Sequence, residues 1–284
     1  MRGAMDCNCR RLAAFLFAGL LVCGCGRAPI ELVNWNVMGT IAAVQTKGDR
    51  DGVRTGKVAA AAMAEFKDLE TLLNAHDPES EISRLAPQPD AQVLRQCAKE
   101  VKPCYEAAFM LCKATGGAFN PRWRGRGTLD LGAIAKGFAV DRACDALAGA
   151  EADVPCLIDL GGNVKSLRGD WRTGVKAVRG DGFAAVVDLH EGEALATSAT
   201  YYRGSHIRDG RTGAVVSNGV ASVTVLCRSA MLADGLSTSL FVLGPEKGRL
   251  LLQEMAQRLA QPVAVYWIMD DGRAFGDARF EQRR

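Results

Sequence analysis

The first half of the chain is dominated by apolar residues that recur at helical spacing. Residues 57–73 place their apolar side chains, from Val58 to Leu73, on one face, which predicts an amphipathic helix. The same spacing predicts shorter helices over 80–85, 91–100 and 104–114. Pro103 opens the last of these helices and Gly116-Gly117 stops it, as proline and glycine do at helix ends.

In the second half of the chain, alternation of apolar and polar residues predominates. This alternation predicts strands over 154–160, 163–168, 172–178, 184–190, 194–198, 220–227 and 263–269, and one earlier strand over 36–46. Helical spacing returns at 229–243 and 245–259. Helices and strands interleave without a strict βαβ rhythm, which favours an α+β (mixed α/β) fold with mixed sheets packed by helices.

Residues 128–141, TLDLGAIAKGFAVD, combine both patterns. They predict a short strand that turns at Gly132 into a helix of small residues, with Lys136 in its first turn. A helix N-terminus with free N–H groups and a lysine can receive an anionic group. Many turns of this kind hold no ligand, so this stretch alone leaves both interpretations open.

Composition sets broad limits on function. The chain has 284 residues, of which 48% are hydrophobic and 24% charged, as in ordinary globular proteins. Its net charge of +3 is too close to neutral to suggest a nucleic-acid partner. We expect one catalytic or binding domain over 36–270, followed by a mobile charged tail over 271–284.

The N-terminus has the pattern of an export signal. Arg10 and Arg11 precede an apolar run of roughly a dozen residues, which is too short to span a bilayer. The run ends in Val-Cys-Gly-Cys, which resembles a bacterial lipobox. We therefore expect a lipoprotein signal peptide over 1–24, lipidation of Cys25, a tether over 25–35, and a lipid-anchored protein on the periplasmic side of a bacterial membrane. An ordinary signal peptide with incidental cysteines is the alternative.

Six cysteines lie beyond this leader. They are Cys97, Cys104, Cys112, Cys144, Cys156 and Cys227. An exported protein can form disulfides, but the pairing cannot be deduced from spacing. Cys104 and Cys112 lie on helical patterns and fit buried free thiols equally well. The spacings match no zinc pattern.

Two further segments carry candidate chemistry. His206 and Asp209 lie three residues apart in a glycine-rich turn, where they could serve acid–base chemistry or simply form a hairpin turn. Asp234 and Thr238 are one helical turn apart, so both oxygens face the same side. A carboxylate and a hydroxyl suit Mg²⁺, although such residues are also common as satisfied polar groups inside helices.

Taken together, these segments resemble the ApbE family, the FAD:protein FMN transferases. The matching motifs are MGT at 38–40, DPESEISRL at 77–85, TGGAFNP at 115–121, DLGAIAKGFAVDRA at 130–143, IDLGGN at 158–163, ATSATYYRG at 196–204, HIRDGRTG at 206–213, SVTV at 222–225 and ADGLSTSLFVLG at 233–244. The resemblance implies an exported, Mg²⁺-dependent enzyme that cleaves FAD. It would attach FMN through a phosphoester bond to a threonine of an exported or membrane acceptor protein, and AMP would leave.

The resemblance also implies roles for residues. Asp234, Thr238 and the carbonyl of Ala133 would hold Mg²⁺, and Lys136 would face the pyrophosphate. His206 would receive the threonine proton, with Asp209 supporting its loop. The residues expected to line the flavin and adenine parts of the site are Met38, Ala118, Phe119, Asn120, Asp130 and Arg208.

This chain departs from the family pattern at several positions. Asn120 stands where the family usually has Asp, Gly210 replaces a usual proline, and Ala199-Thr200 replace a more typical Gly-Asp/Asn pair. The connector at 121–128 is also shorter than expected. Two alternative functions therefore stay open: a FAD pyrophosphatase that gives FMN and AMP, and a lipid-anchored flavin-binding protein without catalysis.

Overall fold

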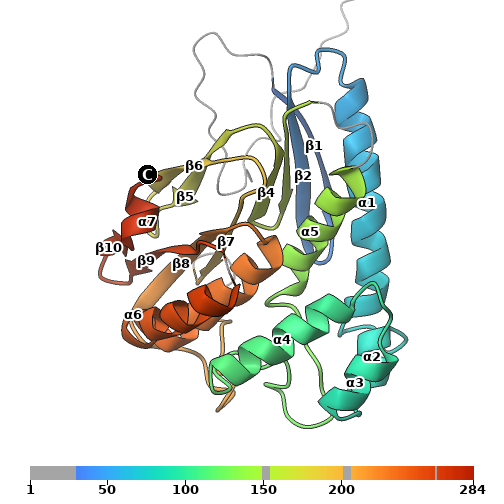
Figure 1. Cartoon of the computed structure of the whole chain (residues 1–284), viewed down its shortest axis with the longest axis vertical. Coiled ribbons are helices and arrows are strands. Elements are labelled where there is room, and N and C mark those ends of the chain that lie inside the picture. Colours follow the sequence, from blue (N-terminus) through green and yellow to red (C-terminus); the bar gives the residue numbers. More distant parts are fainter. Residues whose placement is uncertain (1–29, 149–153, 201–205, 260) are drawn as a thin grey trace, which may run out of the picture.

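The computed structural model describes residues 30–148, 154–200, 206–259 and 261–284, and its main feature is one antiparallel sheet (Figure 1). Its eight strands follow the order β1-β2-β3-β4-β7-β8-β9-β10, and β5 pairs with β6 in a separate hairpin. The strands are β1 (Ile30–Val37), β2 (Thr40–Lys47), β3 (Cys156–Leu160), β4 (Asn163–Arg168), β5 (Trp171–Lys176), β6 (Phe183–Leu189), β7 (Ala194–Ala199), β8 (Val220–Cys227), β9 (Ala264–Met269) and β10 (Ala274–Gly276).

Most of the helices lie on one face of this sheet, and the short C-terminal helix lies on the other. The helices are α1 (Val53–Leu73), α2 (Glu81–Leu85), α3 (Asp90–Gln96), α4 (Lys102–Ala114), α5 (Ala135–Ala148), α6 (Ala230–Leu259) and α7 (Ala278–Glu281). In Figure 1, α1, α5 and α6 lie against the sheet, and α2 to α4 form a group at its lower end. The predicted α+β (mixed α/β) fold class is confirmed.

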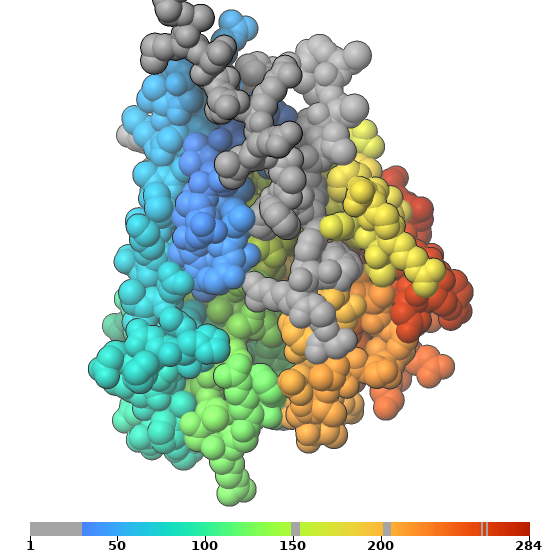
Figure 2. All heavy atoms as spheres, turned by 180° about the vertical axis from the view of Figure 1, so that it is seen from behind, coloured from blue at the N-terminus to red at the C-terminus, as the bar shows by residue number. Residues whose placement is uncertain are grey.

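Two apolar cores lie on opposite faces of the sheet. The larger core packs α1, α4, α5 and α6 against one face and includes the fully buried Phe66 and Phe241. The smaller core lies beneath the β5–β6 hairpin and α7, with Trp171 and Phe280 at its centre. Seen from behind, the hairpin (yellow) adjoins the C-terminal segments (red) (Figure 2), and the amide of Asp188 donates to the carbonyl of Arg283 at 2.9 Å.

Most predicted elements are present, and their boundaries shift by a few residues. The predicted helix over 57–73 begins at Val53. The helices predicted over 229–243 and 245–259 are both present within α6, and Gly244, with a non-helical φ of 72° and ψ of 175°, separates them at the boundary that the sequence indicates.

Four expectations were wrong. The single strand over 36–46 is two strands joined by a tight turn, in which Met38 and Gly39 adopt φ of 51° and 65°. Residues 128–131 form a loop and not a strand. Their two leucines are buried in the core, and this burial produced the apolar pattern that suggested a strand. The tether over 25–35 ends earlier, since β1 begins at Ile30. The tail over 271–284 is folded into β10 and α7 rather than mobile.

The structure also bears on the cysteines and the membrane. The six cysteines from Cys97 onward are free thiols, and all but Cys112 are buried. Over the described ranges, the helices are too short or too polar to cross a bilayer. The expected signal peptide and the lipidation site Cys25 lie outside the described residues.

Candidate active site

The N-terminus of α5 meets the first turns of α6, and this brings together two residues 98 positions apart. Lys136 Nζ lies 3.3 Å from Asp234 Oδ2, and the amide of Gly137 donates to the same oxygen at 3.0 Å. Lys136 Nζ also donates to the carbonyl of Gly132 at 2.8 Å, in the turn that precedes the helix. Asp234 is only 5% exposed, so its carboxylate is buried against a lysine and a helix N-terminus.

The close approach of α5 and α6 depends on two residues of α5. A Cβ at position 137 would lie 2.1 Å from the carbonyl oxygen of Ala230, so only glycine fits there. One turn later, Asp141 caps the start of α6 by accepting from Ser229 Oγ at 2.7 Å and from the amide of Ala230 at 2.9 Å. Lys165 Nζ, on β4, pairs with the same carboxylate at 2.7 Å.

A cluster of hydroxyl groups lies beside Asp234. Ser198, at the end of β7, places its Oγ 2.9 Å from Thr238 Oγ1 and 2.8 Å from Ser237 Oγ. Ser237 Oγ in turn donates to the carbonyl of Asp234 at 2.9 Å. Sequence reasoning assigned a role to Thr238 but none to Ser198 or Ser237, although Ser198 lies in the motif at 196–204 and Ser237 in the motif at 233–244.

The donor groups at this point suit a hard divalent cation. Asp234 supplies a buried carboxylate and Thr238 a hydroxyl one turn away, and both are oxygen donors of the kind that Mg²⁺ prefers. Ala133 lies in the turn just before α5, which begins at Ala135. Among the described residues, no group of three or more His, Cys, Asp and Glu side chains forms a metal cluster, so a cation here would rely on few protein ligands.

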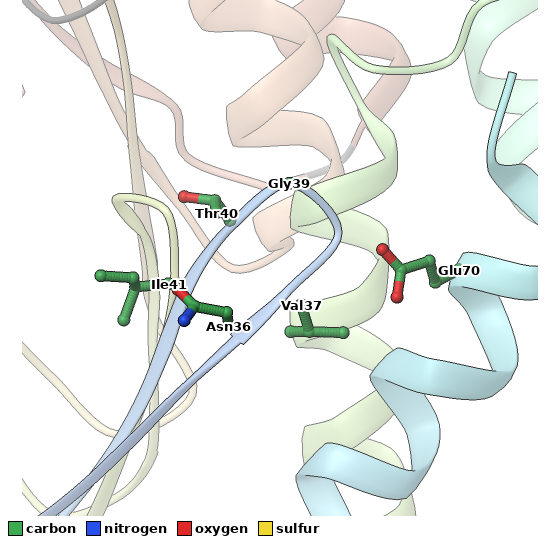
Figure 3. Close-up of a pocket in the computed structure, with 6 residues that line it drawn as sticks. All are labelled: Asn36, Val37, Gly39, Thr40, Ile41 and Glu70. Atoms are coloured by element: carbon green, nitrogen blue, oxygen red, sulfur yellow. The ribbon is translucent and has the colours of Figure 1, made fainter. Parts of the chain in front are cut away.

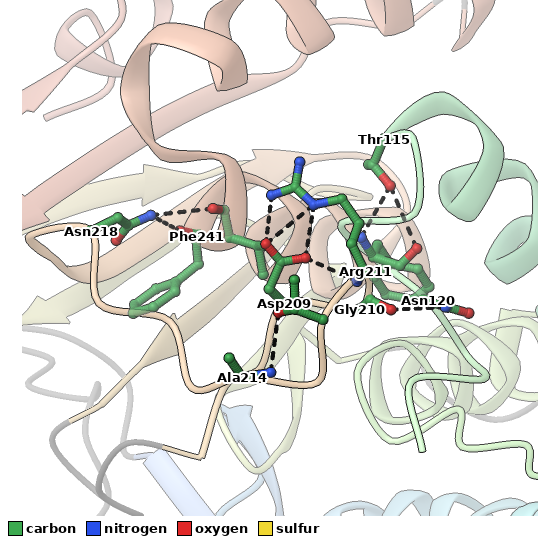
Figure 4. Close-up of polar contacts among 11 residues, drawn as sticks. Thr115, Asn120, Asp209, Gly210, Arg211, Ala214, Asn218 and Phe241 are labelled. Carbon is green, nitrogen blue, oxygen red and sulfur yellow. Dashed lines mark hydrogen bonds and ion pairs between the residues drawn. The ribbon is translucent and has the colours of Figure 1, made fainter. Parts of the chain in front are cut away.

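The turn at 115–120 packs against the loop at 206–213 (Figure 4). Thr115 Oγ1 accepts from the amide of Phe119 at 3.0 Å, and both Ala118 and Phe119 are buried. Asn120 Nδ2 donates to the carbonyl of Gly210 at 3.0 Å, and the amide of Gly210 donates to the carbonyl of Ala118 at 2.9 Å. Asn120 and Gly210 are two of the residues at which this chain departs from the family pattern, and they are therefore in direct contact.

Within the loop, Asp209 pairs with Arg211. Arg211 Nη2 lies 2.5 Å from Asp209 Oδ2, and the hydrogen bonds from the Arg211 side chain and amide hold the pKa of Asp209 below its usual value. The amide of Gly213 donates to the carbonyl of Asp209 at 2.7 Å. The observed partners of Asp209 thus close its own loop. His206 is exposed at the start of this loop.

Trp123 connects three of the candidate segments. Its Nε1 donates to Asp130 Oδ2 at 3.2 Å, and the guanidinium of Arg208 lies 5.5 Å from its ring centre. Asp130 Oδ1 accepts from the amide of Gly132 at 2.9 Å, which ties it to the turn that precedes α5. Sequence reasoning noted the short basic connector around Trp123 but gave this residue no role.

The turn that contains Met38 borders a cavity of about 590 Å³ (Figure 3). The cavity is lined by Asn36, Val37, Gly39, Thr40, Ile41 and Glu70. Met38 adopts the left-handed φ of 51°, which is uncommon for a residue with a side chain. Its amide donates to Glu70 Oε1 on α1 at 2.8 Å, so Glu70, which the sequence did not single out, holds this turn.

Comparison with known proteins decides the family. A model of the ApbE family matches residues 38–126 and 122–261. The chain belongs to the ApbE family. The two matching segments meet at 122–126, within the connector that the sequence marks as short. The order of the motifs, from the Met38 turn to the Asp234 helix, is therefore that of the family.

The chain also resembles named ApbE proteins. It is 40% identical over 135 residues to a FAD:protein FMN transferase of Klebsiella pneumoniae (strain 342), covering 44% of this chain and 42% of the relative. It is 35% identical over 158 residues to one of Vibrio cholerae, covering 51% and 46%. The matched region thus spans less than half the length of these relatives.

Solved structures share the fold. The flavin transferase ApbE of Vibrio cholerae superposes with a TM-score of 0.72 at 22% identity, over 90% of this chain and 100% of that one. The apo flavinyl transferase ApbE of Pseudomonas stutzeri gives a TM-score of 0.71 at 23% identity, over 90% and 97%.

Proposed function

We propose that this protein is a FAD:protein FMN transferase that attaches FMN through a phosphoester bond to a threonine of an acceptor protein. The observation that carries the proposal is the convergence of Lys136 Nζ and the Gly137 amide on Asp234 Oδ2, with Thr238 one turn away. A lysine at a helix N-terminus, next to a buried carboxylate and a partly buried hydroxyl, suits a pyrophosphate bound with a cation.

In this reaction the threonine Oγ attacks the phosphorus of the FMN half of FAD. The new P–O bond forms as the bond to the AMP phosphate breaks, and AMP leaves with the bridging oxygen. His206, exposed at the edge of the loop, receives the proton of the threonine hydroxyl. Lys136 orients the pyrophosphate and stabilises the negative charge on its oxygens in the transition state.

Mg²⁺ is the cofactor that this donor set would hold. Asp234, Thr238 and the carbonyl of Ala133 are the groups we assign to it. When bound, the ion would neutralise charge on the phosphate oxygens. The hydrogen bonds from Ser198 to Ser237 and Thr238 would keep the Thr238 hydroxyl in place for this purpose.

The leader sequence is the support for our proposal of where the protein acts. The basic and apolar segments at the N-terminus, ending at Cys25, support export and a lipid anchor on the periplasmic side of a bacterial membrane. The acceptor protein of this transferase would then be an exported or membrane protein. Radiolabelled palmitate incorporated into the wild-type chain and absent from Cys25→Ala would support the anchor, and label retained in Cys25→Ala would contradict it.

The decisive experiment measures AMP release from FAD with Mg²⁺, with and without an exported flavoprotein acceptor. Transferase activity predicts AMP together with a covalently flavinylated acceptor. AMP and free FMN at full rate without acceptor would instead identify a FAD pyrophosphatase. FAD recovered intact, with and without acceptor, would indicate a flavin-binding protein without catalysis.

A further inference from the structure

The loop at 206–213 is attached to the turn at 117–120 by a reciprocal pair of hydrogen bonds. Asn120 Nδ2 donates to the carbonyl of Gly210 at 3.0 Å, and the amide of Gly210 donates to the carbonyl of Ala118 at 2.9 Å. The backbones are in close contact here, because a Cβ at position 210 would lie 2.4 Å from Asn120 Cβ and 2.5 Å from the carbonyl oxygen of Gly117.

Both ends of the Asn120 side chain are engaged. Its Oδ1 accepts from the amide of Arg122 at 2.8 Å and lies 3.8 Å from Cys112 Sγ, which is a weak donor. Because both of these donors lie on the same side of the Asn120 amide, that side carries the oxygen. The NH₂ group therefore faces the carbonyl of Gly210. An asparagine satisfies both contacts at once, whereas an ionised aspartate could accept from Arg122 but could not donate to Gly210.

The loop is internally braced, so fixing Gly210 fixes its neighbours. The amide of Asp209 donates to the carbonyl of Ala214 at 2.9 Å, and Arg208 Nη1 donates to the carbonyl of Gly213 at 2.9 Å. His206 lies at the start of this braced segment. A shift at Gly210 would therefore be transmitted toward His206.

We infer that Asn120 is a positioning residue that holds the 206–213 loop, and through it His206, rather than a group that contacts the nucleotide. The inference rests on the proposed function for the role of His206. It replaces the expectation that Asn120 lines the flavin and adenine parts of the site. It also gives a physical reason for Gly210, since a proline there has no amide hydrogen to donate to Ala118.

The test is Asn120→Asp in the full chain, followed by hydrogen–deuterium exchange of the peptide that covers 206–216. At neutral pH the new carboxylate faces the carbonyl of Gly210, so exchange should accelerate on the order of tenfold, as expected for the loss of a partly buried hydrogen bond. As the pH falls through the pKa of the new carboxyl, about 4, its protonated form can donate again, and protection relative to wild type should return.

Asn218→Asp is the matched control. Asn218 Nδ2 donates to the carbonyl of Phe241 at 2.8 Å, and its Oδ1 accepts from the amide of Val220 at 3.2 Å, which repeats the bonding pattern of Asn120 (Figure 4). This control should leave the exchange of the 206–213 loop unchanged. Asn120→Ala, which adds no charge, should also loosen the loop, but without recovery at low pH.

Function provides the second measurement. A positioning role predicts that Asn120→Asp lowers kcat for FMN transfer on the order of tenfold, as expected for a displaced catalytic group, while the Kd for FAD stays unchanged. Weaker FAD binding with unchanged loop exchange would show a nucleotide contact and overturn the inference. Faster exchange with unchanged kcat would overturn it as well. If the proposed function is wrong, the wild-type protein will transfer no FMN. The exchange and FAD-binding measurements then still decide whether Asn120 holds the loop or contacts the nucleotide.

Discussion

The amide of Gly137 on α5 donates to Asp234 Oδ2 on α6 at 3.0 Å, and this single bond fixes where the carboxylate lies relative to Lys136. It forms because the two helices touch backbone to backbone at Ala230, where even a methyl group would collide. One turn further along α5, Asp141 accepts from the amide of Ala230 and so holds the start of α6 against α5. The geometry of the candidate site thus depends on how α5 and α6 pack.

Gly137→Ala should separate the two helices. The new methyl group meets the backbone carbonyl of Ala230 at 2.1 Å, which cannot yield as a side chain would. We expect a loss of about 1–3 kcal/mol in the free energy of unfolding, measured by urea denaturation, together with a lower rate of FAD cleavage.

Gly56→Ala is the control for this substitution. Gly56 is exposed on α1, and a Cβ there meets nothing within 4 Å. Alanine at this position should raise stability by about 0.4–1 kcal/mol and leave FAD cleavage unchanged. Equal stability of the two variants would contradict the close packing of α5 and α6.

Asp234→Asn should remove the cation site. The substitution keeps the size of the side chain but loses the charge that faces Lys136 and a bound divalent cation. Binding of Mn²⁺, followed by electron paramagnetic resonance, should weaken on the order of a hundredfold, and FAD cleavage should fall with it. In the wild type, removal of metal with EDTA should abolish cleavage and added Mg²⁺ should restore it.

Ser239→Ala controls for changes inside the same helix. Ser239 is buried on α6 and donates to the carbonyl of Gly235 at 2.7 Å, within its own helix. This variant should bind Mn²⁺ as the wild type does. Unaltered Mn²⁺ affinity in Asp234→Asn would rule out Asp234 as a ligand.

Sequence patterns located the local elements and not the contacts between them. The helix over 57–73 and the Asp234–Thr238 pair follow from spacing along one helix, which is a local property. The bond between Asn120 and Gly210 joins residues 90 positions apart, and no periodicity encodes it. Their shared departure from the family pattern was the available signal, and it takes the fold to show that they touch.

For the C-terminal tail, the sequence pattern predicted less structure than the protein has. Its charges suggested mobility, but Phe280 is fully buried and stacks on Tyr266 with ring centres 4.9 Å apart. This aromatic ring attaches the charged segment to the smaller core, together with the pairing of β10 with β9 and the hydrogen bond from the Asp188 amide to the Arg283 carbonyl.

Phe280→Ala should therefore destabilise the whole domain. Truncation of a buried aromatic ring leaves a cavity and typically costs about 3–5 kcal/mol, which urea denaturation would detect. Arg279→Ala, at the exposed neighbouring position, should change stability by less than about 0.5 kcal/mol. Similar stability of Phe280→Ala and wild type would mean that the tail does not contribute to the fold.

The raised pKa of Asp159 predicts how the free energy of unfolding depends on pH. Burial raises the pKa of this carboxyl to about 7, although the amide of Gly162 donates to it at 2.8 Å and lowers the pKa. The folded state therefore holds a proton that the unfolded state, with a pKa of about 3.9, releases. Between these two values, Asp159 makes stability fall as the pH rises, by up to about 1.4 kcal/mol per pH unit.

Asp159→Asn should abolish this contribution. The amide oxygen of asparagine can still accept from Gly162, and the side chain carries no charge to bury. Urea denaturation at pH 4.5, 6 and 7.5 should show a flatter dependence than in the wild type, and the variant should be the more stable of the two at pH 7.5. Asp188→Asn, at an exposed position, should retain the wild-type slope. A variant that loses stability with pH as steeply as the wild type would mean that Asp159 stays ionised in the folded protein.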